Sequence, residues 1–260
     1  MWASQHKTSQ APKRIVSLVP SQTELLYHLQ LETETVGITK FCVHPPHWLL
    51  EKTRVGGTKN INIDIIKSLK PDLIIANKEE NIKADVMHLA NDFPVWVTDV
   101  KNLDDAKNMI LDIGSLTHKT VESRKIWDDI QHLSDHRTPL QQCVKKAIYL
   151  IWKDPYMTVG GDTYINEMMK LADIDNLYKD SLRYPAISDL QEAAEQADLI
   201  LLSSEPYPFK ENHVEELKKI FPNKEIMIVD GEMFSWYGSR LLESIPYLKA
   251  MRADLYHIQP

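Results

Sequence analysis

Short apolar runs alternate with helix-period segments along almost the whole chain, and this alternation limits what the chain can fold into. Runs rich in Val, Ile and Leu that are bounded by turn residues are typical of buried parallel strands. The segments between them place apolar residues three and four positions apart, as helices that cover a sheet do. An order of strand, helix and strand predicts βαβ units and therefore an α/β fold with parallel sheets.

The predicted elements are distributed over both halves of the chain. The strands are expected at Arg14–Leu18, Thr35–Ile38, Leu73–Ala76, Val95–Thr98, Lys146–Ile151, Leu199–Ser203 and Glu225–Val229. The helices are expected at Ser21–Leu29, Asn62–Leu69, Ile82–Asn91, Asp162–Leu171, Ser188–Gln196 and Glu211–Ile220.

The two halves of the chain resemble each other. The stretch Leu69–Ile75 is echoed by Gln196–Leu201, each consisting of a helix end, an Asp and an apolar strand. A long strand-free stretch, Leu103 to Leu133, separates the halves and is helical in pattern, with Thr117 as the expected N-cap of its second part. We expect the chain to cross once between two lobes that enclose a ligand cleft. The predicted parts are an N-terminal α/β lobe at 12–117, one connecting backbone helix at 118–135 and a C-terminal α/β lobe at 143–260.

Composition excludes several classes of protein. With 43% hydrophobic and 26% charged residues, the chain is typical of a globular protein with a sizeable core. Its net charge of −7 argues against a nucleic-acid surface, which requires clustered Lys and Arg. Two cysteines, Cys42 and Cys143, are too few for a disulfide scaffold. We expect a monomer.

The first residues bear on the compartment. They contain no apolar stretch of the signal-peptide kind, so the sequence as written predicts a cytoplasmic protein. A periplasmic or lipoprotein location is the alternative if a leader precedes this sequence.

Two motifs can each begin a helix and can also lie beside a bound ligand. Ser21 and Glu24 have the spacing of a capping box, after a strand whose end should face the crevice of an open sheet. In the second half, Gly160 and Gly161 allow close backbone approach, and Asp162 is an expected N-cap. For Ser21 and Glu24 the preferred interpretation is a stabilised helix start, and a ligand-facing role is the alternative. For the glycine pair and Asp162, a helix cap alone and a cap that also contacts a ligand are held open equally.

The stretch from Cys42 to His47 contains a thiol and two imidazoles but matches no closed zinc site. The interpretation that we prefer is a proline-stiffened loop that presents Phe41 and His44. A direct contact of Cys42 or His44 with the metal of a ligand is the alternative, and no structural metal site is predicted.

Loop aromatics in the second half indicate a flat, partly apolar ligand. These residues are Tyr156, Tyr184, Tyr207, Phe209, Phe234, Trp236 and Tyr237. Arg240 is expected either to pair with an acidic edge of the ligand or to form a structural salt bridge. The sequence contains neither a nucleophile elbow nor a zinc-protease helix, so an enzyme is not predicted.

Several stretches resemble the cobalamin and ferric-siderophore receptors of ABC importers, the class with a rigid helical backbone between its lobes. The similarity is greatest to the cobalamin-binding branch and extends over almost the whole chain. The matching stretches are Arg14–Glu24, Val36–Thr39, Val55–Thr58, Leu69–Ile74 and Trp236–Arg240.

The resemblance implies positions for ligand contacts and for permease docking. Phe41 falls at a family aromatic residue that contacts the corrin, and Tyr184 at a family tryptophan. Glu232 and Trp236 lie on a loop that supplies polar and basic contacts, whereas Thr58 and Asn77 replace family tryptophans. The predicted ligand-binding residues are Ser21, Phe41, His44, Thr58, Asn77, Tyr156, Tyr184, Tyr207, Glu232, Trp236 and Arg240. The docking acids are expected at Asp64 and, next to Leu190 in the second lobe, at Asp189.

We therefore expect a substrate-binding protein with no cofactor of its own. Its ligand is a metal chelate, with a corrinoid such as cobalamin ahead of a ferric siderophore or haem, and its expected partner is an ABC importer permease. One alternative is a cytosolic corrinoid-handling protein that docks no permease. Another, from a different class, is a metal-insertion or chelatase-like enzyme.

Overall fold

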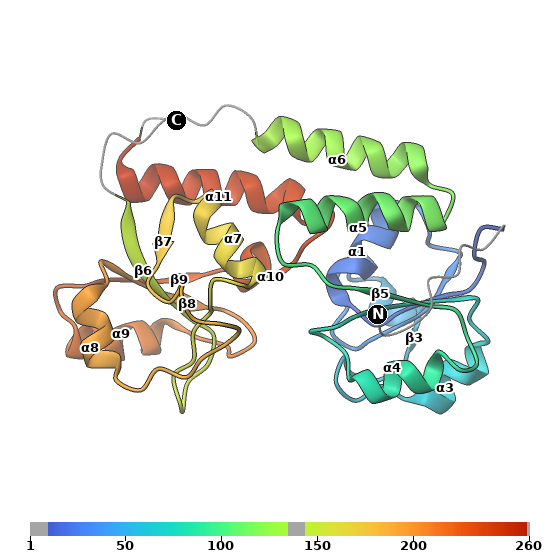
Figure 1. Cartoon of the computed structure of the whole chain (residues 1–260), viewed down its shortest axis with the longest axis horizontal. Helices are drawn as coiled ribbons and strands as arrows, with labels where there is room; N and C mark the ends of the chain where they lie inside the picture. The colour runs from blue at the N-terminus through green and yellow to red at the C-terminus, as the bar shows by residue number, and fades with distance from the viewer. Residues whose placement is uncertain (1–9, 135–143, 259–260) are drawn as a thin grey trace. The chain divides into compact units, whose positions relative to one another are not determined.

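The computed structural model describes residues 10–134 and 144–258, which form two compact units (Figure 1). Unit 1 consists of the described residues up to Val100, of Asp104–His132 and of Tyr237–Arg240. Unit 2 consists of Lys101–Leu103, of the described residues between Leu133 and Trp236, and of those from Leu241 onward. The predicted Cys143 lies outside the described residues.

Unit 1 is a parallel five-stranded sheet with the order β3-β2-β1-β4-β5. Its strands are β1 (Ile15–Ser17), β2 (Thr35–Ile38), β3 (Thr53–Arg54), β4 (Leu73–Asn77) and β5 (Val95–Thr98). Its helices are α1 (Pro20–His28), α2 (Trp48–Glu51), α3 (Ile63–Leu69), α4 (Lys83–Leu89), α5 (Leu103–Leu116) and α6 (Thr120–Ser134). Figure 1 shows α3 and α4 on one face of the sheet and α1 and α5 on the other.

Alternate strand residues form the core of unit 1, as the pleat of a strand requires. Val16 and Leu18 lie in one buried cluster with Ile74 and Ala76 of β4 and with apolar residues of α3 and α4. Because helices cover both faces of the sheet, the intervening strand residues are buried as well. This explains why the sequences of the strands are continuously apolar.

Unit 2 is a parallel four-stranded sheet with the order β7-β6-β8-β9. Its strands are β6 (Lys145–Leu150), β7 (Ile174–Asn176), β8 (Leu199–Ser203) and β9 (Glu225–Val229). Its helices are α7 (Tyr164–Leu171), α8 (Leu190–Gln196), α9 (Glu211–Ile220), α10 (Gly231–Ser235) and α11 (Leu241–Tyr256). Ile148 and Leu150 of β6 pack with β8 residues against apolar side chains of α8 and α9. The predicted α/β fold of two parallel sheets flanked by helices is confirmed.

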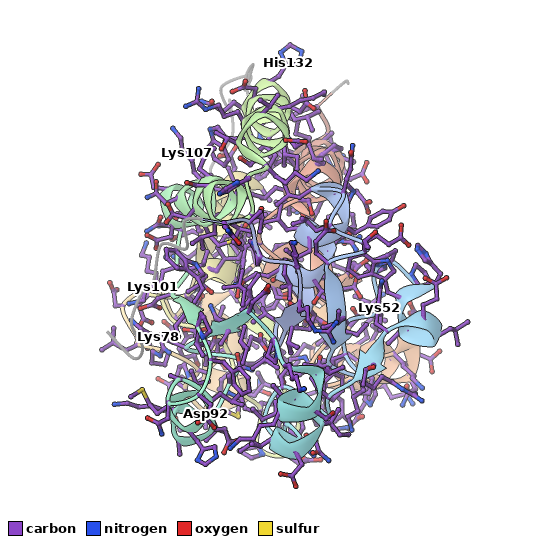
Figure 2. All side chains as sticks on the ribbon, turned by 90° about the vertical axis from the view of Figure 1, so that its right-hand side faces the viewer. Lys52, Lys78, Asp92, Lys101, Lys107 and His132 are labelled. Carbon is purple, nitrogen blue, oxygen red and sulfur yellow. The ribbon has the colours of Figure 1, made fainter. Side chains whose placement is uncertain are left out.

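Helices α5 and α6 pack closely at a single glycine of unit 1. A Cβ atom on Gly114 of α5 would lie 2.0 Å from Ser123 Oγ and 2.3 Å from Ser123 Cβ of α6, so no larger residue fits without movement. Further along, the Lys107 ammonium (Figure 2) lies 5.5 Å from the centre of the Trp127 ring, a cation–π contact between the same helices. The sequence range predicted as the connecting helix contains α6, and its role as a connector stays a prediction.

The chain returns to unit 1 with Tyr237–Arg240, so the prediction that it crosses only once is wrong. In this return segment, Ser239 Oγ lies 3.0 Å from His28 Nδ1, and Arg240 forms an ion pair with Glu24. Both partners belong to the region of α1. The return was not visible in the sequence because a segment of four residues contains no helix or strand period of its own.

Three predicted helix caps differ from the structure. Helix α1 begins at Pro20 after Val19, with no side-chain cap, so Ser21 and Glu24 form no capping box. Proline at this position needs no partner for an N–H, which reduces the need for a cap. Helix α7 is capped by Thr163 and not by Asp162, which instead accepts a hydrogen bond from Arg183 N. Thr117 precedes α6 but donates to Ile113 O of the previous helix.

The Gly160–Gly161 pair approaches its own chain closely. A Cβ on Gly160 would lie 2.4 Å from Ser181 O, and one on Gly161 would lie 1.9 Å from Lys179 O. The close backbone approach predicted for these glycines is real, but the approaching atoms are carbonyl oxygens of unit 2 itself. The pair therefore has a structural role in holding the 179–183 loop.

Gly114→Ala should destabilise the protein. The added methyl group overlaps Ser123, and overpacking of this kind lowers the free energy of unfolding by about 1–3 kcal/mol. This occurs although Ala is otherwise preferred to Gly within a helix by about 1 kcal/mol. Urea denaturation measures the change, and Ser115→Ala on the exposed side of α5 is the control. A second substitution, Ser123→Gly, should restore part of the loss; unchanged stability of Gly114→Ala would contradict the packing.

Candidate functional site

The order of the strands identifies the ligand-facing edge of each sheet. In an open parallel sheet, ligands bind outside the carboxyl ends of the strands, where neighbouring strands continue in opposite directions. In unit 1 this switch point lies between β1 and β4, and in unit 2 it lies between β6 and β8. Most of the predicted ligand-binding residues follow strand ends at these two edges.

Phe41 presents the most accessible aromatic ring at the edge of unit 1. It follows β2, and 50% of the side chain is exposed. The Lys40 ammonium lies 5.0 Å from the ring centre, and a Cβ atom on Gly57 would lie 3.1 Å from the ring. Thr58, half-buried, follows this glycine, and its carbonyl oxygen accepts a hydrogen bond from Asn81. Phe41 and the Gly57–Thr58 turn are therefore neighbours, and their contact with a ligand stays a prediction.

Asn77 is buried in a hydrogen-bonded network at the end of β4. Its Nδ2 donates to Thr98 Oγ1 at 3.1 Å, and its Oδ1 accepts from the backbone N–H groups of Glu79 and Glu80. The Gln22 side chain also donates to Thr98 Oγ1, at 2.5 Å. Asn77 thus fixes the turn after β4, and a direct contact of its side chain with a ligand stays a prediction.

Arg240 forms a buried ion pair instead of an open ligand contact. Its Nε donates to Glu24 Oε2 at 3.0 Å, its Nη2 lies 2.6 Å from Oε1, and only 4% of the residue is exposed. The structural salt bridge, one of the two alternatives for this arginine, is the one present. Ser21 is also buried, in the first turn of α1, so its side chain lies below the surface.

The surroundings of Cys42 disfavour a metal contact at this thiol, and a contact of His44 with the metal of a ligand stays a prediction. The Cys42 thiol is fully buried between the hydroxyls of Thr23, at 3.1 Å, and Thr39, at 3.2 Å. Burial raises the pKa of this thiol, which disfavours the thiolate that binds metals. Half-buried His44 belongs to no cluster of three or more His, Cys, Asp or Glu ligand atoms among the described residues. The interpretation of a loop that presents Phe41 therefore gains support.

An aromatic pair lies at the switch point of unit 2. Trp152 follows β6 and Tyr207 follows β8, and their ring centres are 5.6 Å apart in an edge-to-face arrangement. Trp152 is 41% exposed, which is unusual for this residue type. The sequence analysis identified Tyr207 but missed Trp152. Its position two residues after a strand was the available signal.

Tyr156 and Tyr184 are half-buried in the loops after β6 and β7. Tyr156 packs against the core that α8 and α9 cover, and burial raises the pKa of its hydroxyl. These loops are joined by backbone hydrogen bonds from Ile187 N to Tyr156 O and from Thr158 N to Pro185 O. Both tyrosines therefore belong to one connected loop region at the edge of unit 2.

Trp236 is buried and not a surface aromatic. Only 7% of it is exposed, and its indole N–H donates to Glu205 Oε1 at 3.1 Å. Ser235 Oγ donates to the same oxygen at 2.6 Å. Trp236 therefore supports the loop that follows β8, and its replacement by Ala should affect stability as well as binding.

Glu205 is the centre of an acidic group at this edge. Burial raises its pKa, the charges of Glu232 and Asp230 raise it further, and the bonds from Ser235 and Trp236 lower it in part. Half-buried Glu232 begins α10, where its N–H donates to Asp230 Oδ1 at 3.0 Å. The predicted ligand contact Glu232 thus lies beside two further carboxylates.

The two acids predicted to dock a permease, Asp64 and Asp189, are exposed at helix starts. Asp64 is in the first turn of α3, while Asp189 caps α8 by accepting from the N–H groups of Gln191 and Glu192.

Two hollows elsewhere on the units contain none of the predicted ligand-binding residues. One, of about 170 Å³, lies between β5 and α5, and the other, of about 290 Å³, lies between β9 and α11. The carboxyl edge of each sheet therefore remains a candidate site, taken for each unit by itself.

Glu205→Gln should change how stability depends on pH. Because the pKa of Glu205 is raised in the folded state, its favourable contribution is complete below the unfolded-state pKa and is lost as the pH rises through the folded-state pKa. The melting temperature of Glu205→Gln relative to wild type should therefore increase between about pH 4 and about pH 8. Glu215→Gln, on the exposed side of α9, is the control. A difference that decreases with pH would contradict the assignment.

Relatives of known sequence support a common family. The family described as periplasmic binding protein matches residues 15–221. The ABC transporter substrate-binding lipoprotein YvrC of Bacillus subtilis is 28% identical over 68% of this chain, and the matched region spans 59% of that protein. A vitamin B12-binding protein of Vibrio cholerae is 30% identical over 74% of this chain and 70% of its own length.

Solved structures agree at the level of the fold. The periplasmic vitamin B12-binding protein BtuF of Vibrio cholerae superposes with a TM-score of 0.73 at 22% identity, covering 95% of this chain and 99% of that one. No helix within the described part of the chain has the length and apolar character of a membrane span. Since the family match extends over most of the sequence, the chain belongs to the periplasmic binding protein family.

Proposed function

We propose that this protein is the substrate-binding receptor of an ABC importer and that its ligand is a corrinoid, with a ferric siderophore or haem as the next candidates. The observation that carries the proposal is the exposure of aromatic rings at the carboxyl edge of each sheet. These rings are Phe41 in unit 1 and the Trp152–Tyr207 pair in unit 2. Apolar rings next to a few polar groups are suited to a large, flat and partly apolar ligand.

The polar groups beside the rings suit a ligand whose rim carries amides. Unit 2 offers the carboxyl groups of Glu205 and Glu232, and unit 1 offers the ammonium of Lys40. Corrinoids combine an apolar macrocycle with peripheral amides, which need both donors and acceptors. The names of the Vibrio cholerae relatives, which state vitamin B12 binding, favour this ligand over the others. The location of the ligand between the lobes stays a prediction.

The chelatase-like alternative has no support at the residues that suggested it. It depended on metal insertion at Cys42 and His44, and the Cys42 thiol is buried with a raised pKa. A family of binding proteins provides no positive reason to expect catalysis. We therefore propose a receptor without enzymatic activity.

Phe41→Ala should weaken the binding of cobalamin. Loss of a half-exposed ring that stacks on the ligand should cost about 1–2 kcal/mol, or about five- to thirtyfold in Kd. Titration calorimetry with cyanocobalamin and aquocobalamin measures this, with an expected stoichiometry of about one. Ile220→Ala, an equally exposed apolar residue at the end of α9, is the control.

Three outcomes separate the parts of this proposal. Absence of cobalamin binding together with binding of haem or a ferric catecholate would replace the corrinoid and keep the receptor. Absence of binding to all three ligands would remove the chelate assignment. Cobalamin binding that Phe41→Ala and Trp152→Ala leave unchanged would move the site away from the sheet edges.

The relatives favour a receptor outside the cytoplasm. One carries the word lipoprotein in its name and the other the word periplasmic, so the predicted cytoplasmic location finds no support among them. We propose that the protein meets an importer permease through exposed carboxylates, one of which is Asp64. In unit 2 the Asp189 carboxylate already caps α8, so the neighbouring exposed Glu192 is the more available acid.

Ligand-loaded protein should stimulate ATP hydrolysis by a cobalamin importer reconstituted in liposomes. Asp64→Asn should reduce this stimulation several-fold because an interfacial charge pair is lost, while cobalamin affinity stays the same. Asp104→Asn, another exposed acid in the first turn of a helix, is the control. Tight cobalamin binding without any stimulation would favour the cytosolic alternative, a corrinoid-handling protein that docks no permease.

A further inference from the structure

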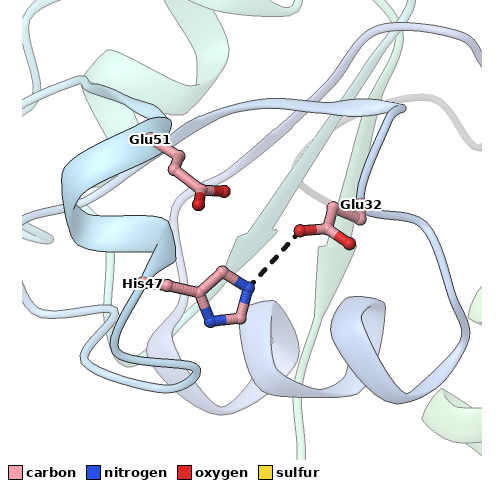
Figure 3. A group of neighbouring side chains, drawn as sticks. All are labelled: Glu32, His47 and Glu51. Atoms are coloured by element: carbon pink, nitrogen blue, oxygen red, sulfur yellow. Dashed lines mark ion pairs between the residues drawn. The ribbon is translucent and has the colours of Figure 1, made fainter.

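A cluster of one histidine and two glutamates lies on the surface of unit 1, apart from the residues discussed above. It consists of Glu32, His47 and Glu51, whose potential ligand atoms all lie within 4.8 Å of one another (Figure 3). No other group of at least three His, Cys, Asp or Glu side chains in the described ranges comes this close. All three side chains are exposed to solvent.

The backbone brings these three side chains together. His47 precedes α2 with helical dihedral angles, and Glu51 N donates to His47 O at 3.2 Å. Residues four apart on a helical turn project from the same face, so His47 and Glu51 form a chelating pair. Glu32 comes from the connection between α1 and β2. Figure 3 shows its carboxylate and the His47 ring facing each other.

The separation of the His47 and Glu32 atoms suits a metal ion better than a hydrogen bond. His47 Nε2 lies 3.4 Å from Glu32 Oε1, beyond the usual range of about 2.7–3.2 Å for an N–H···O bond. A zinc ion binds imidazole nitrogen and carboxylate oxygen at about 2.1 Å in a tetrahedral arrangement. Two such ligands are then about 3.4 Å apart. Nitrogen and oxygen are therefore already at the spacing that zinc imposes.

The surroundings orient two of the ligands and leave the third available. The Tyr27 ring packs edge-to-face on His47 with centres 5.8 Å apart, and the Trp48 indole N–H makes a long, weak contact of 3.4 Å with Glu32 Oε1. No hydrogen bond or ion pair within the described residues engages the Glu51 carboxylate. Glu51 is thus free to rotate toward an ion held by the other two side chains.

The ammonium of Lys52 lies close to this cluster. The Lys52 ammonium (Figure 2) is held by the Glu32 carbonyl oxygen at 2.6 Å and lies 5.1 Å from the centre of the Trp48 ring. It therefore bonds to the main chain of Glu32, and the Glu32 carboxylate keeps its own charge for the ion. The two carboxylates of the cluster attract a divalent cation.

We propose that Glu32, His47 and Glu51 bind a divalent transition-metal ion of the zinc type. The imidazole favours zinc over calcium or magnesium, which prefer sites made of oxygen atoms only. Three protein ligands leave a fourth position for water or for a group from another molecule. A bound ion would cross-link α2 to the connection between α1 and β2 and would stabilise this edge of unit 1.

Titration of the untagged full chain with zinc chloride tests the site. We expect one saturable site that His47→Ala and Glu51→Gln each weaken by at least about tenfold, since loss of an outer-shell partner alone costs about that much. Calcium chloride should not compete. A zinc-dependent increase in Tm should disappear in both variants.

His88→Ala, another exposed histidine of unit 1, is the matched control and should bind zinc as wild type does. Glu51→Gln protects the test against a folding defect, because no described contact depends on that carboxylate. Equal losses in His88→Ala and His47→Ala, no loss in either Glu51→Gln or His47→Ala, or the absence of saturable binding would each overturn the proposal. None of these outcomes depends on cobalamin binding, so the site and the proposed function are tested separately.

Discussion

The buried ion pair between Glu24 and Arg240 is the interaction on which the arrangement of unit 1 depends. Removing two charges from water is costly, and only a close, multiply bonded pair offsets that cost. Neither partner can therefore be buried alone, and the return segment Tyr237–Arg240 must lie against α1 for Glu24 to be compensated. Other contacts follow from this position. The Tyr237 hydroxyl lies 3.5 Å from Gln22 Nε2 near the start of α1, and Ser239 Oγ contacts His28 at its end, so the return segment is fixed along the length of this helix.

Secondary structure and fold class could be predicted from the sequence because they depend on local periodicity. Strands buried on both faces must be apolar throughout, and the run Leu199–Ser203 predicted for β8 agrees with the observed bounds. Helix starts were predicted less well, since Ser21 and Asp162 have capping chemistry but use it elsewhere or not at all. Which side chain accepts a hydrogen bond from the free N–H groups at a helix start depends on the neighbours in the folded structure. The local sequence does not contain that information.

The candidate site was only partly predictable for a related reason. Phe41 and Tyr207 could be identified because they follow strand ends and cannot be buried by their own segment. Trp236 and Arg240 have the same local character, yet their partners Glu205 and Glu24 are 31 and 216 residues away and remove them from the surface. Trp152 also follows a strand end and offered the same local signal, but only the strand order β7-β6-β8-β9 shows that it lies at a switch point beside Tyr207. Strand order is a property of the folded sheet and not of any single strand.

The hydrogen-bonded network of Gln22, Asn77 and Thr98 has a consequence for the kinetics of recognition. These amides and the hydroxyl are buried and already bonded to one another, so the edge of unit 1 is rigid before any ligand arrives. A ligand that meets such a surface does not have to order it, and the entropic cost of association is correspondingly small. For the chelates proposed above as ligands, encounter rates at this edge should then vary little with the identity of the chelate. Differences in affinity among these chelates should then come mainly from differences in the dissociation rates of their complexes.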